Sequence, residues 1–397
     1  MLQSILIYSS LLIVMIICNA FTVKKDASID SRTVIKSKKF WSVDIVVPSL
    51  LFAIVFGMRF DVGTDHLNYL IGYLNNDYVS KGEPFFNLLS SIGWYLNLHY
   101  ATYFGIIAFL QITFFLYAFK EEKYLYPFLV FFLFTNGEWL SWMNIIRQSL
   151  AICIWIHSLK FIEDKRFLKY FLGCFVAYLF HNSAIILVVL YPILKSDKVY
   201  FKSIKLQLTL LGCAFIFREL FTSILYKIEP LIESYSAVIG GGVYKGYNVE
   251  TLNNSFIESN GTGLVYLLRI IINVIVISYS KKLRYFFNSR RFNIFYFLFF
   301  IGLITFYMFP IGLISVTRPF RYFYIFQSIM YAYFLYYLYK TRLRNTKLSN
   351  VNTILYLLLI IVFICVFLVS IISANDDSHL LYQFYFDQKI QGYPSKY

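Results

Sequence analysis

Long apolar runs alternate with short polar stretches along the whole chain of 397 residues. A helix needs about 20 apolar residues to cross the hydrocarbon core of a bilayer, and many of these runs approach that length. The pattern predicts ten spans, near residues 3–22, 42–58, 101–119, 124–143, 146–162, 206–226, 263–280, 294–314, 322–339 and 351–374. We therefore expect an all-α, polytopic transmembrane helical bundle that forms a single membrane domain over residues 1–397.

Two further apolar segments do not fit this alternation. Residues 84–99 are short and amphipathic and follow Glu83-Pro84, which predicts a short interfacial helix. Residues 168–194 begin and end at basic loops, so they form either a re-entrant hairpin that turns near residues 181–183 or one tilted span. A single crossing would move the later basic loops outside, against the rule that short basic loops stay in the cytoplasm. The hairpin is therefore favoured.

The composition excludes a soluble fold. Hydrophobic residues make up 59% of the chain and charged residues 14%, whereas a soluble globular domain is about 25% charged. The net charge of +15 comes mainly from lysines and arginines in short loops, a placement typical of cytoplasmic loops that gives no sign of nucleic-acid binding. The five cysteines lie in apolar runs without C-x-x-C spacing, which predicts packing residues rather than disulfides or metal ligands.

Alternation of the spans places both termini and several polar segments on the outward side. These segments are residues 59–83, 138–147 and 227–262, the turn at 318–321 and the tail from 375. The outward loop at about 227–262 holds three consecutive glycines, but no G-K-[ST] follows them. Flexible loop backbone is therefore a better interpretation than a phosphate-binding loop.

Four arginines on the outward side are candidate ligands for a phosphate-bearing substrate. They are Arg59, Arg147, Arg318 and Arg321. A planar guanidinium group matches two phosphate oxygens at once, so converging arginines at a membrane surface suit a lipid-linked phosphate or diphosphate. The alternative is that each one contacts lipid headgroups or pairs with Asp61, Asp65 or Glu138.

Acid and base candidates on the same side are fewer. Asp61 and Asp65 have helical spacing, and His181 lies at the polar break of the expected hairpin. A carboxylate or an imidazole near a sugar hydroxyl could accept its proton, but the two aspartates could also hold Arg59, and His181 could be a buried packing residue. Tyr69 could stack on a sugar or belong to an interfacial aromatic belt. The acids lack D-x-D spacing, so we expect neither a metal nor another cofactor.

Four short motifs resemble those of the EpsG family of bacterial membrane proteins. Residues 59–69 read R-x-x-x-G-T-D-x-x-x-Y, and Glu83-Pro84-Phe85 is similar to the E-P-[G]-[FY] element. Residues 147–151 match R-Q-x-[LI]-A, and residues 180–184 match F-H-x-S-A. The elements occur in the family's order. The departures are Phe86 and Asn87, where glycine is common, and His66, where tyrosine usually follows G-T-D.

The resemblance implies a Wzy-like polymerase of O-antigen, capsule or exopolysaccharide with a GT-C-like helical bundle. Such an enzyme joins undecaprenyl-diphosphate-linked repeat units at the outer face of the cytoplasmic membrane without a metal or a nucleotide. Its partners would be the lipid-linked glycan, membrane lipid and a chain-length regulator protein. Arg147 would bind the diphosphate at the reacting centre, and Asp65 or His181 would orient or deprotonate the acceptor. Arg59, Asp61, Tyr69, Glu138, Arg318 and Arg321 would bind substrate.

Other functions remain open at this point. A flippase for lipid-linked oligosaccharides would also be basic inside, and Arg218 and Arg269 lie within predicted spans, where a transporter would need charge. An O-antigen ligase differs only in its acceptor. A structural subunit of an export complex would tolerate alanine in the outward motifs.

Overall fold

The computed structural model describes residues 1–27, 40–77, 82–218, 220, 223–224, 227, 263–309, 317–342, 347–374 and 379–387. Almost all of the expected outward loop at 227–262, with its triple glycine, lies outside these residues. The described part of the chain is nearly all helical, as the apolar runs predict, and its chain segments form two compact units.

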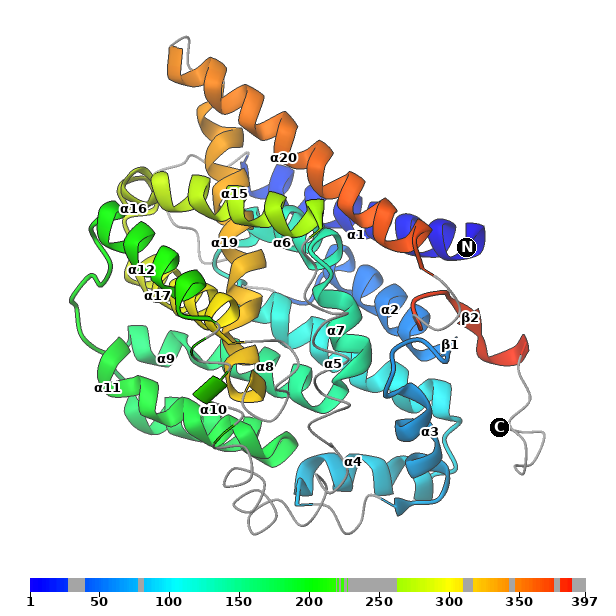
Figure 1. Ribbon diagram of the computed structural model, residues 1–397. Coiled ribbons are helices and arrows are strands. Elements are labelled where there is room, and N and C mark those ends of the chain that lie inside the picture. The colour runs from blue at the N-terminus through cyan, green and yellow to red at the C-terminus, as the bar shows by residue number, and fades with distance from the viewer. Residues whose placement is uncertain are drawn as a thin grey trace. The chain divides into compact units, whose positions relative to one another are not determined.

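The first unit comprises residues 1–191 and 338–397 (Figure 1). Its elements are α1 (Leu2–Ala27), α2 (Val43–Gly57), β1 (Arg59–Phe60), α3 (His66–Leu74), α4 (Pro84–Tyr95), α5 (Tyr100–Ala118), η2 (Lys123–Leu125), α6 (Tyr126–Thr135), α7 (Glu138–Asn144), α8 (Ile146–Ser158), α9 (Lys160–Glu163), α10 (Phe167–Phe180), η3 (Asn182–Val189), α20 (Lys347–Ile372), β2 (Gln383–Phe384) and η6 (Tyr385–Asp387). Helix α5 packs against both α2 and α8, and α8 packs against α10. The short helix α11 (Leu190–Leu194) crosses the boundary between the units.

The second unit comprises residues 192–337. Its elements are α12 (Ile204–Ile216), α15 (Leu264–Ser278), α16 (Ser280–Phe287), α17 (Arg290–Met308), η4 (Arg318–Phe320) and most of α19 (Arg321–Thr341). Helix α12 packs against α15 and α17. A buried amide organises the interior, because Asn273 donates to the Tyr307 hydroxyl at 3.1 Å and accepts from the Tyr331 hydroxyl at 2.7 Å.

Four described helices are long and apolar enough to cross a membrane: Leu2–Phe21, Tyr100–Ala118, Arg290–Met308 and Ser349–Ile372. The pair α15 and α16, bent by 56°, would make a fifth. The protein is therefore a helical membrane protein, and the count of ten spans stays a prediction. The expected span at 124–143 is interrupted, because Gly137 has a φ of +85° and separates α6 from α7.

Residues 167–191 fold back on themselves, as expected for a hairpin. Helix α10 ends at Phe180, His181 adopts an extended conformation, and the 3-10 helix η3 follows. The Tyr170 hydroxyl donates to the carbonyl of Leu187 at 2.6 Å, and the Phe167 and Tyr191 rings lie 4.9 Å apart. Residues on the two sides of the turn are therefore neighbours. The expected helix after Glu83-Pro84 is also present as α4, with Pro84 in its first turn.

The crossing of α2 and α5 depends on small residues. A Cβ atom on Gly57 would lie 2.3 Å from the carbonyl oxygen of Ala101 and 3.1 Å from the Cα of Gly105. Close backbone approach at small residues is a common way to pack helices in membranes. Because α2 ends at Gly57, this crossing fixes where the chain enters the Arg59 segment.

We expect Gly57→Ala to destabilise the protein by about 1–3 kcal/mol, because the added methyl group must push α2 away from α5. Gly212→Ala in α12 is the matched control, since a Cβ atom there meets nothing within 4 Å. That change should be neutral or slightly stabilising. Thermal unfolding of the two variants in detergent checks this, and equal midpoints would contradict the proposed crossing.

Candidate functional site

Backbone conformation and close packing explain why glycine stands at position 63 in the Gly63-Thr64-Asp65 turn. Gly63 has a φ of +94°, and a Cβ atom there would lie 3.3 Å from the Cα of Asn144. The Asn144 side-chain oxygen accepts from the Thr64 hydroxyl at 3.0 Å and from the Asp65 backbone N–H at 2.8 Å. Asn144 ends α7, so this amide joins the turn to the α7–α8 junction just before Arg147.

Arg59 holds the same junction from inside the protein. Its side chain is buried, and its guanidinium donates to the carbonyls of Phe56 at 2.6 Å, Val62 at 3.2 Å and Met143 at 2.9 Å. Burial lowers its pKa to about 10, which leaves it charged at neutral pH. The guanidinium that the sequence suggested as a substrate ligand is thus hydrogen-bonded to three backbone carbonyls and fixes the loop. Its part in substrate binding stays a prediction.

Asp61 does not hold Arg59, contrary to one expectation. Its carboxylate instead lies 3.1 Å from Nδ1 of His379 in the C-terminal segment. The same segment pairs with the loop as a two-stranded antiparallel sheet, β1 with β2, and the His379 carbonyl accepts from the Gly63 N–H at 2.9 Å. The C-terminal segment therefore supports residues 59–65, which are termed the motif loop.

Glu83 joins two of the other motifs. One carboxylate oxygen forms an ion pair with the Arg147 guanidinium, and the other lies 2.6 Å from Nδ1 of His181. The Glu83 side chain is 6% exposed, against 12% for His181 and 21% for Arg147. The start of α4 also packs against the end of α10, because the ring centroids of Phe85 and Phe180 lie 5.7 Å apart.

Tyr69 brings the first motif to the same place. Nε of Arg147 donates to the Tyr69 hydroxyl at 3.4 Å, and the guanidinium carbon lies 5.5 Å from the Tyr69 ring centroid and 5.6 Å from that of Phe86. A guanidinium between aromatic faces is held by cation–π attraction as well as by its ion pair. Tyr69, Glu83, Arg147 and His181, one from each motif, therefore form one cluster, termed the motif cluster below.

The charges of the motif cluster determine its protonation. Burial alone would raise the pKa of Glu83, but the hydrogen bond with His181 and the charge of Arg147 outweigh burial and hold that pKa below its ordinary value. Burial raises the pKa of the Tyr69 hydroxyl, and Arg147 offsets only part of the rise. At neutral pH, Glu83 is therefore an acceptor and Tyr69 keeps its proton.

The remaining candidates lie in different surroundings. Asp65 is half-buried at the start of α3, and its carboxylate makes no hydrogen bond or ion pair with another described residue. Glu138 lies in the first turn of α7, close enough to the Cys153 thiol to affect it electrostatically. Arg318 begins η4 and Arg321 begins α19, both in the second unit. Their part in a site with Arg147 stays a prediction.

Two residues that organise the site were not among the expected functional ones. Glu83 was noted only as part of a motif, although a carboxylate directly before an amphipathic helix could have suggested a role. Asn144 carried no usable signal, because an asparagine between two short helices is common. His66, a departure from the motif, is fully buried, and burial together with the charge of Arg59 holds its pKa well below the ordinary value. It therefore stays neutral.

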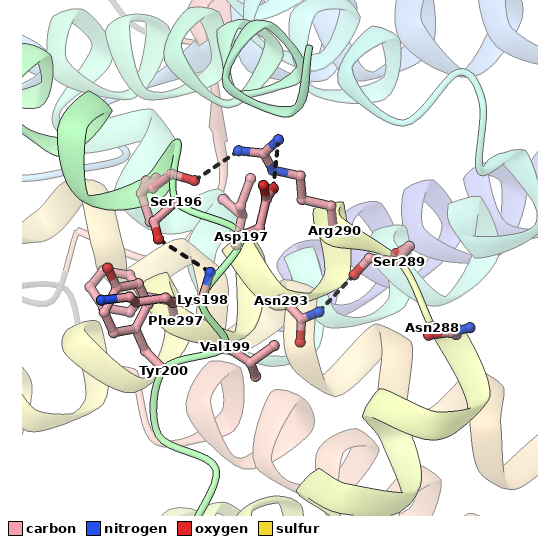
Figure 2. A pocket seen from close by; sticks show the side chains of 12 residues that line it. Ser196, Asp197, Lys198, Val199, Tyr200, Asn288, Ser289, Arg290, Asn293 and Phe297 are labelled. Carbon is pink, nitrogen blue, oxygen red and sulfur yellow. Dashed lines mark hydrogen bonds and ion pairs between the residues drawn. The ribbon is translucent and has the colours of Figure 1, made fainter. Parts of the chain in front are cut away.

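A separate cavity of about 220 Å³ lies in the second unit (Figure 2). It is lined by residues 194, 196–200, 288–290, 293–294 and 297. Figure 2 shows Arg290 reaching Asp197, at 3.2 Å, across this space. None of the four motifs contributes to it, and its loops are those that the sequence predicts to face the cytoplasm. In the described part of the chain, no three His, Cys, Asp or Glu side chains group as metal ligands would.

Comparison with known families supports the resemblance seen in the motifs. The model of the EpsG family matches residues 44–384 of the chain. No curated protein and no solved structure matches it. The match extends from α2 to β2 and includes every member of the motif cluster.

We expect Glu83→Gln to destabilise the protein in a pH-dependent way. Because the folded pKa of Glu83 is lowered, its ion pairs stabilise the fold fully above the ordinary glutamate value of about 4.3, and this contribution is lost as the pH falls through the folded value. The cost at neutral pH should be about 3 kcal/mol, since the change leaves a buried charge without its partner. Unfolding curves of the detergent-solubilised protein, measured from neutral to acid pH, check this.

Asp164→Asn is the control for that experiment. Asp164 pairs with Arg166 at 3.6 Å, and both side chains are more than half exposed. Its loss should cost less than about 1 kcal/mol. A cost for Glu83→Gln that does not change between neutral and acid pH would contradict the assignment of Glu83 as an ionised partner.

Proposed function

Because the chain belongs to the EpsG family, we propose that it polymerises oligosaccharide repeat units carried on undecaprenyl diphosphate. The product would be O-antigen, capsular or exopolysaccharide. The enzyme would transfer the growing chain from its lipid carrier to a hydroxyl group of the next unit. The observation that carries this proposal is the motif cluster, in which four segments far apart in the sequence bring a cation and a base candidate together.

The reaction needs little from the protein beyond charge and position. A new bond forms between the acceptor oxygen and the anomeric carbon of the donor sugar, while the bond from that carbon to the diphosphate breaks. The bonding electrons leave with the lipid diphosphate, and the acceptor proton passes to a base. A fixed cation beside the leaving group stabilises its developing charge, and Arg147 is the candidate for this role. Asp65 and His181 are the candidates for the base.

Arg147 is suited to that role by its surroundings. Its ion pair with Glu83 and the aromatic rings of Tyr69 and Phe86 fix the guanidinium before substrate arrives, while the side chain is still 21% exposed. Preorganised charge of this kind does not have to reorient during the reaction. The binding of phosphate or sugar acids by Arg318 and Arg321, which lie in the second unit, is a separate expectation from the sequence. Arg59 would contribute indirectly, by holding the loop.

The proposed compartment follows from the basic loops. Lysines and arginines concentrate in the loops expected inside, which leaves the motif segments on the outer face of the cytoplasmic membrane. Lipid-linked glycan, membrane lipid and a chain-length regulator are the proposed partners. Chemistry there would be independent of nucleotide and metal, since the lipid diphosphate bond supplies the energy.

A flippase for the same lipid-linked unit is the second candidate. In its favour, Arg269 lies within α15, and Arg218 contacts the Tyr266 hydroxyl of that helix at 3.3 Å. A polymerase and a flippase bind the same diphosphate, so the discriminating observation is the glycan itself.

We expect deletion of the gene to leave single repeat units on the acceptor, with long chains lost. A flippase deletion would remove the single units as well, and a ligase deletion would leave polymer on its lipid carrier. Gel analysis of the surface glycan, together with analysis of the lipid-linked pool, separates the three outcomes. Single capped units support the polymerase, and either other pattern contradicts it.

Complementation with variants then tests the motif cluster. Arg147→Ala should reduce long-chain glycan by about 10²–10³-fold, as expected for loss of a fixed transition-state charge. Arg147→Lys, which keeps the charge for Glu83, should recover only part of the activity because it lacks the planar fork. Arg166→Ala, an exposed arginine of the same unit, should retain full chains. Normal chain length in Arg147→Ala at normal protein abundance would rule out this role for Arg147.

A further inference from the structure

The imidazole of His181 has two nitrogens in different situations. Nδ1 lies 2.6 Å from the Glu83 carboxylate. Nε2 is buried and has no hydrogen-bond partner among the described residues. The ring as a whole is 12% exposed, so it lies just beneath the surface of its unit. The cluster therefore contains one bonded ring nitrogen and one without a partner.

An unbonded buried nitrogen is unfavourable. Leaving such a group without a partner destabilises the folded protein, and most buried polar atoms in folded proteins have a partner. A ring held at Nδ1 by a carboxylate cannot turn to satisfy Nε2 without breaking that bond. The geometry therefore preserves a hydrogen-bonding position that a bound hydroxyl group could fill.

The state of Glu83 decides which nitrogen carries the proton. Its second oxygen is bound to Arg147, and its pKa is held below the ordinary value, so the carboxylate is ionised and can only accept. Nδ1 of His181 must then be the donor. In the neutral ring this leaves the lone pair on Nε2, the nitrogen without a partner.

We propose that Glu83 is a positioning residue that fixes His181 in the Nδ1–H form and makes Nε2 the base for the acceptor hydroxyl. This inference rests on the proposed function, which supplies the reaction. It chooses His181 over Asp65 as the base. The acceptor O–H gives its proton to Nε2 as its oxygen bonds to the anomeric carbon, and the bond to the diphosphate breaks. Glu83 stabilises the resulting imidazolium, in the way that a carboxylate supports a catalytic histidine.

Asp65 is the competing base, and the structure distinguishes the two residues. The Asp65 carboxylate is half-buried, and no residue in the described part of the chain bonds to it and fixes its orientation, although its backbone N–H is held by Asn144. His181 is held through a charged acceptor that is itself held by Arg147. A general base needs a fixed orientation, which favours His181.

The tautomer of His181 can be determined by a measurement that needs no enzyme assay. Solid-state NMR of the full-length protein in lipid bilayers, with ¹⁵N-labelled histidine, distinguishes protonated from unprotonated ring nitrogens. The chain has five histidines, and the His181→Asn spectrum assigns the signal of interest by its absence. We expect neutral His181 to carry its proton on Nδ1 and to lose this fixed preference in Glu83→Gln. A proton on Nε2 in the wild-type protein would overturn the proposal.

The kinetic test uses lipid-linked single units extracted from the deletion strain as substrate. Glu83→Gln should lower kcat by about 10²–10⁴-fold, the usual contribution of general base catalysis, with little change in KM. Loss of the carboxylate also destabilises the imidazolium, so the acid limb of the pH–rate profile should move to lower pH. Glu83→Asp should recover part of kcat, which a purely structural role would not explain. Asp164→Asn should leave both parameters unchanged.

The possible failures can be told apart. If the acid limb disappears in Asp65→Asn but remains in His181→Asn, Asp65 is the base and the proposal is wrong. If the purified wild-type protein does not polymerise the extracted units, the proposed function is wrong, while the NMR result still decides whether Glu83 fixes the tautomer of His181. A folded Glu83→Gln variant with wild-type kcat and pH profile would refute the positioning role.

Discussion

The buried carboxylate of Glu83 is the constraint on which the rest of the candidate site depends. A carboxylate that is 6% exposed must be paired, and Glu83 meets this requirement with the Arg147 guanidinium on one oxygen and the His181 ring on the other. These partners come from α8 and from the end of α10. One charged group at the start of α4 therefore fixes the relative positions of three helices, and no one of these partners could be removed without leaving another unsatisfied.

The scaffold around this cluster is held mainly by side chains that bond to backbone groups. Arg59 reaches three carbonyls, and Asn144 accepts from the turn that carries Thr64 and Asp65. Irregular backbone near a membrane requires such partners, because lipid cannot satisfy its polar groups. The paired strands β1 and β2 add the C-terminal segment to the same scaffold. The contacts that hold the motif loop thus all come from residues of the first unit.

Two arginines that each begin a motif lie in different surroundings in this arrangement. Arg59 is buried against backbone carbonyls, whereas Arg147 is partly exposed, lies near two aromatic rings and pairs with Glu83. The same division separates the histidines, since His66 is neutral and enclosed while His181 is held by a charge. Residues of the same type therefore differ in this structure in which of their polar atoms are already bonded.

The sequence by itself determined the class of the protein and its family. Hydrophobic run length predicts membrane helices because a bilayer has a fixed thickness, and the fold-back of residues 167–191 followed from the placement of charge. Short motifs identified the family, and the fold brings residues of these four motifs together. Boundaries were less accurate, as the break at Gly137 shows, because apolar residues continue through it.

Only the tertiary structure decided which motif residues meet. Glu83 and Asn144 act through partners about 60 to 100 positions away, and no local pattern encodes such a contact. Arg59 and Arg147 look alike in the sequence, since both border an apolar run. Their environments differ because burial and hydrogen bonding depend on which distant backbone and side-chain groups the fold brings beside them.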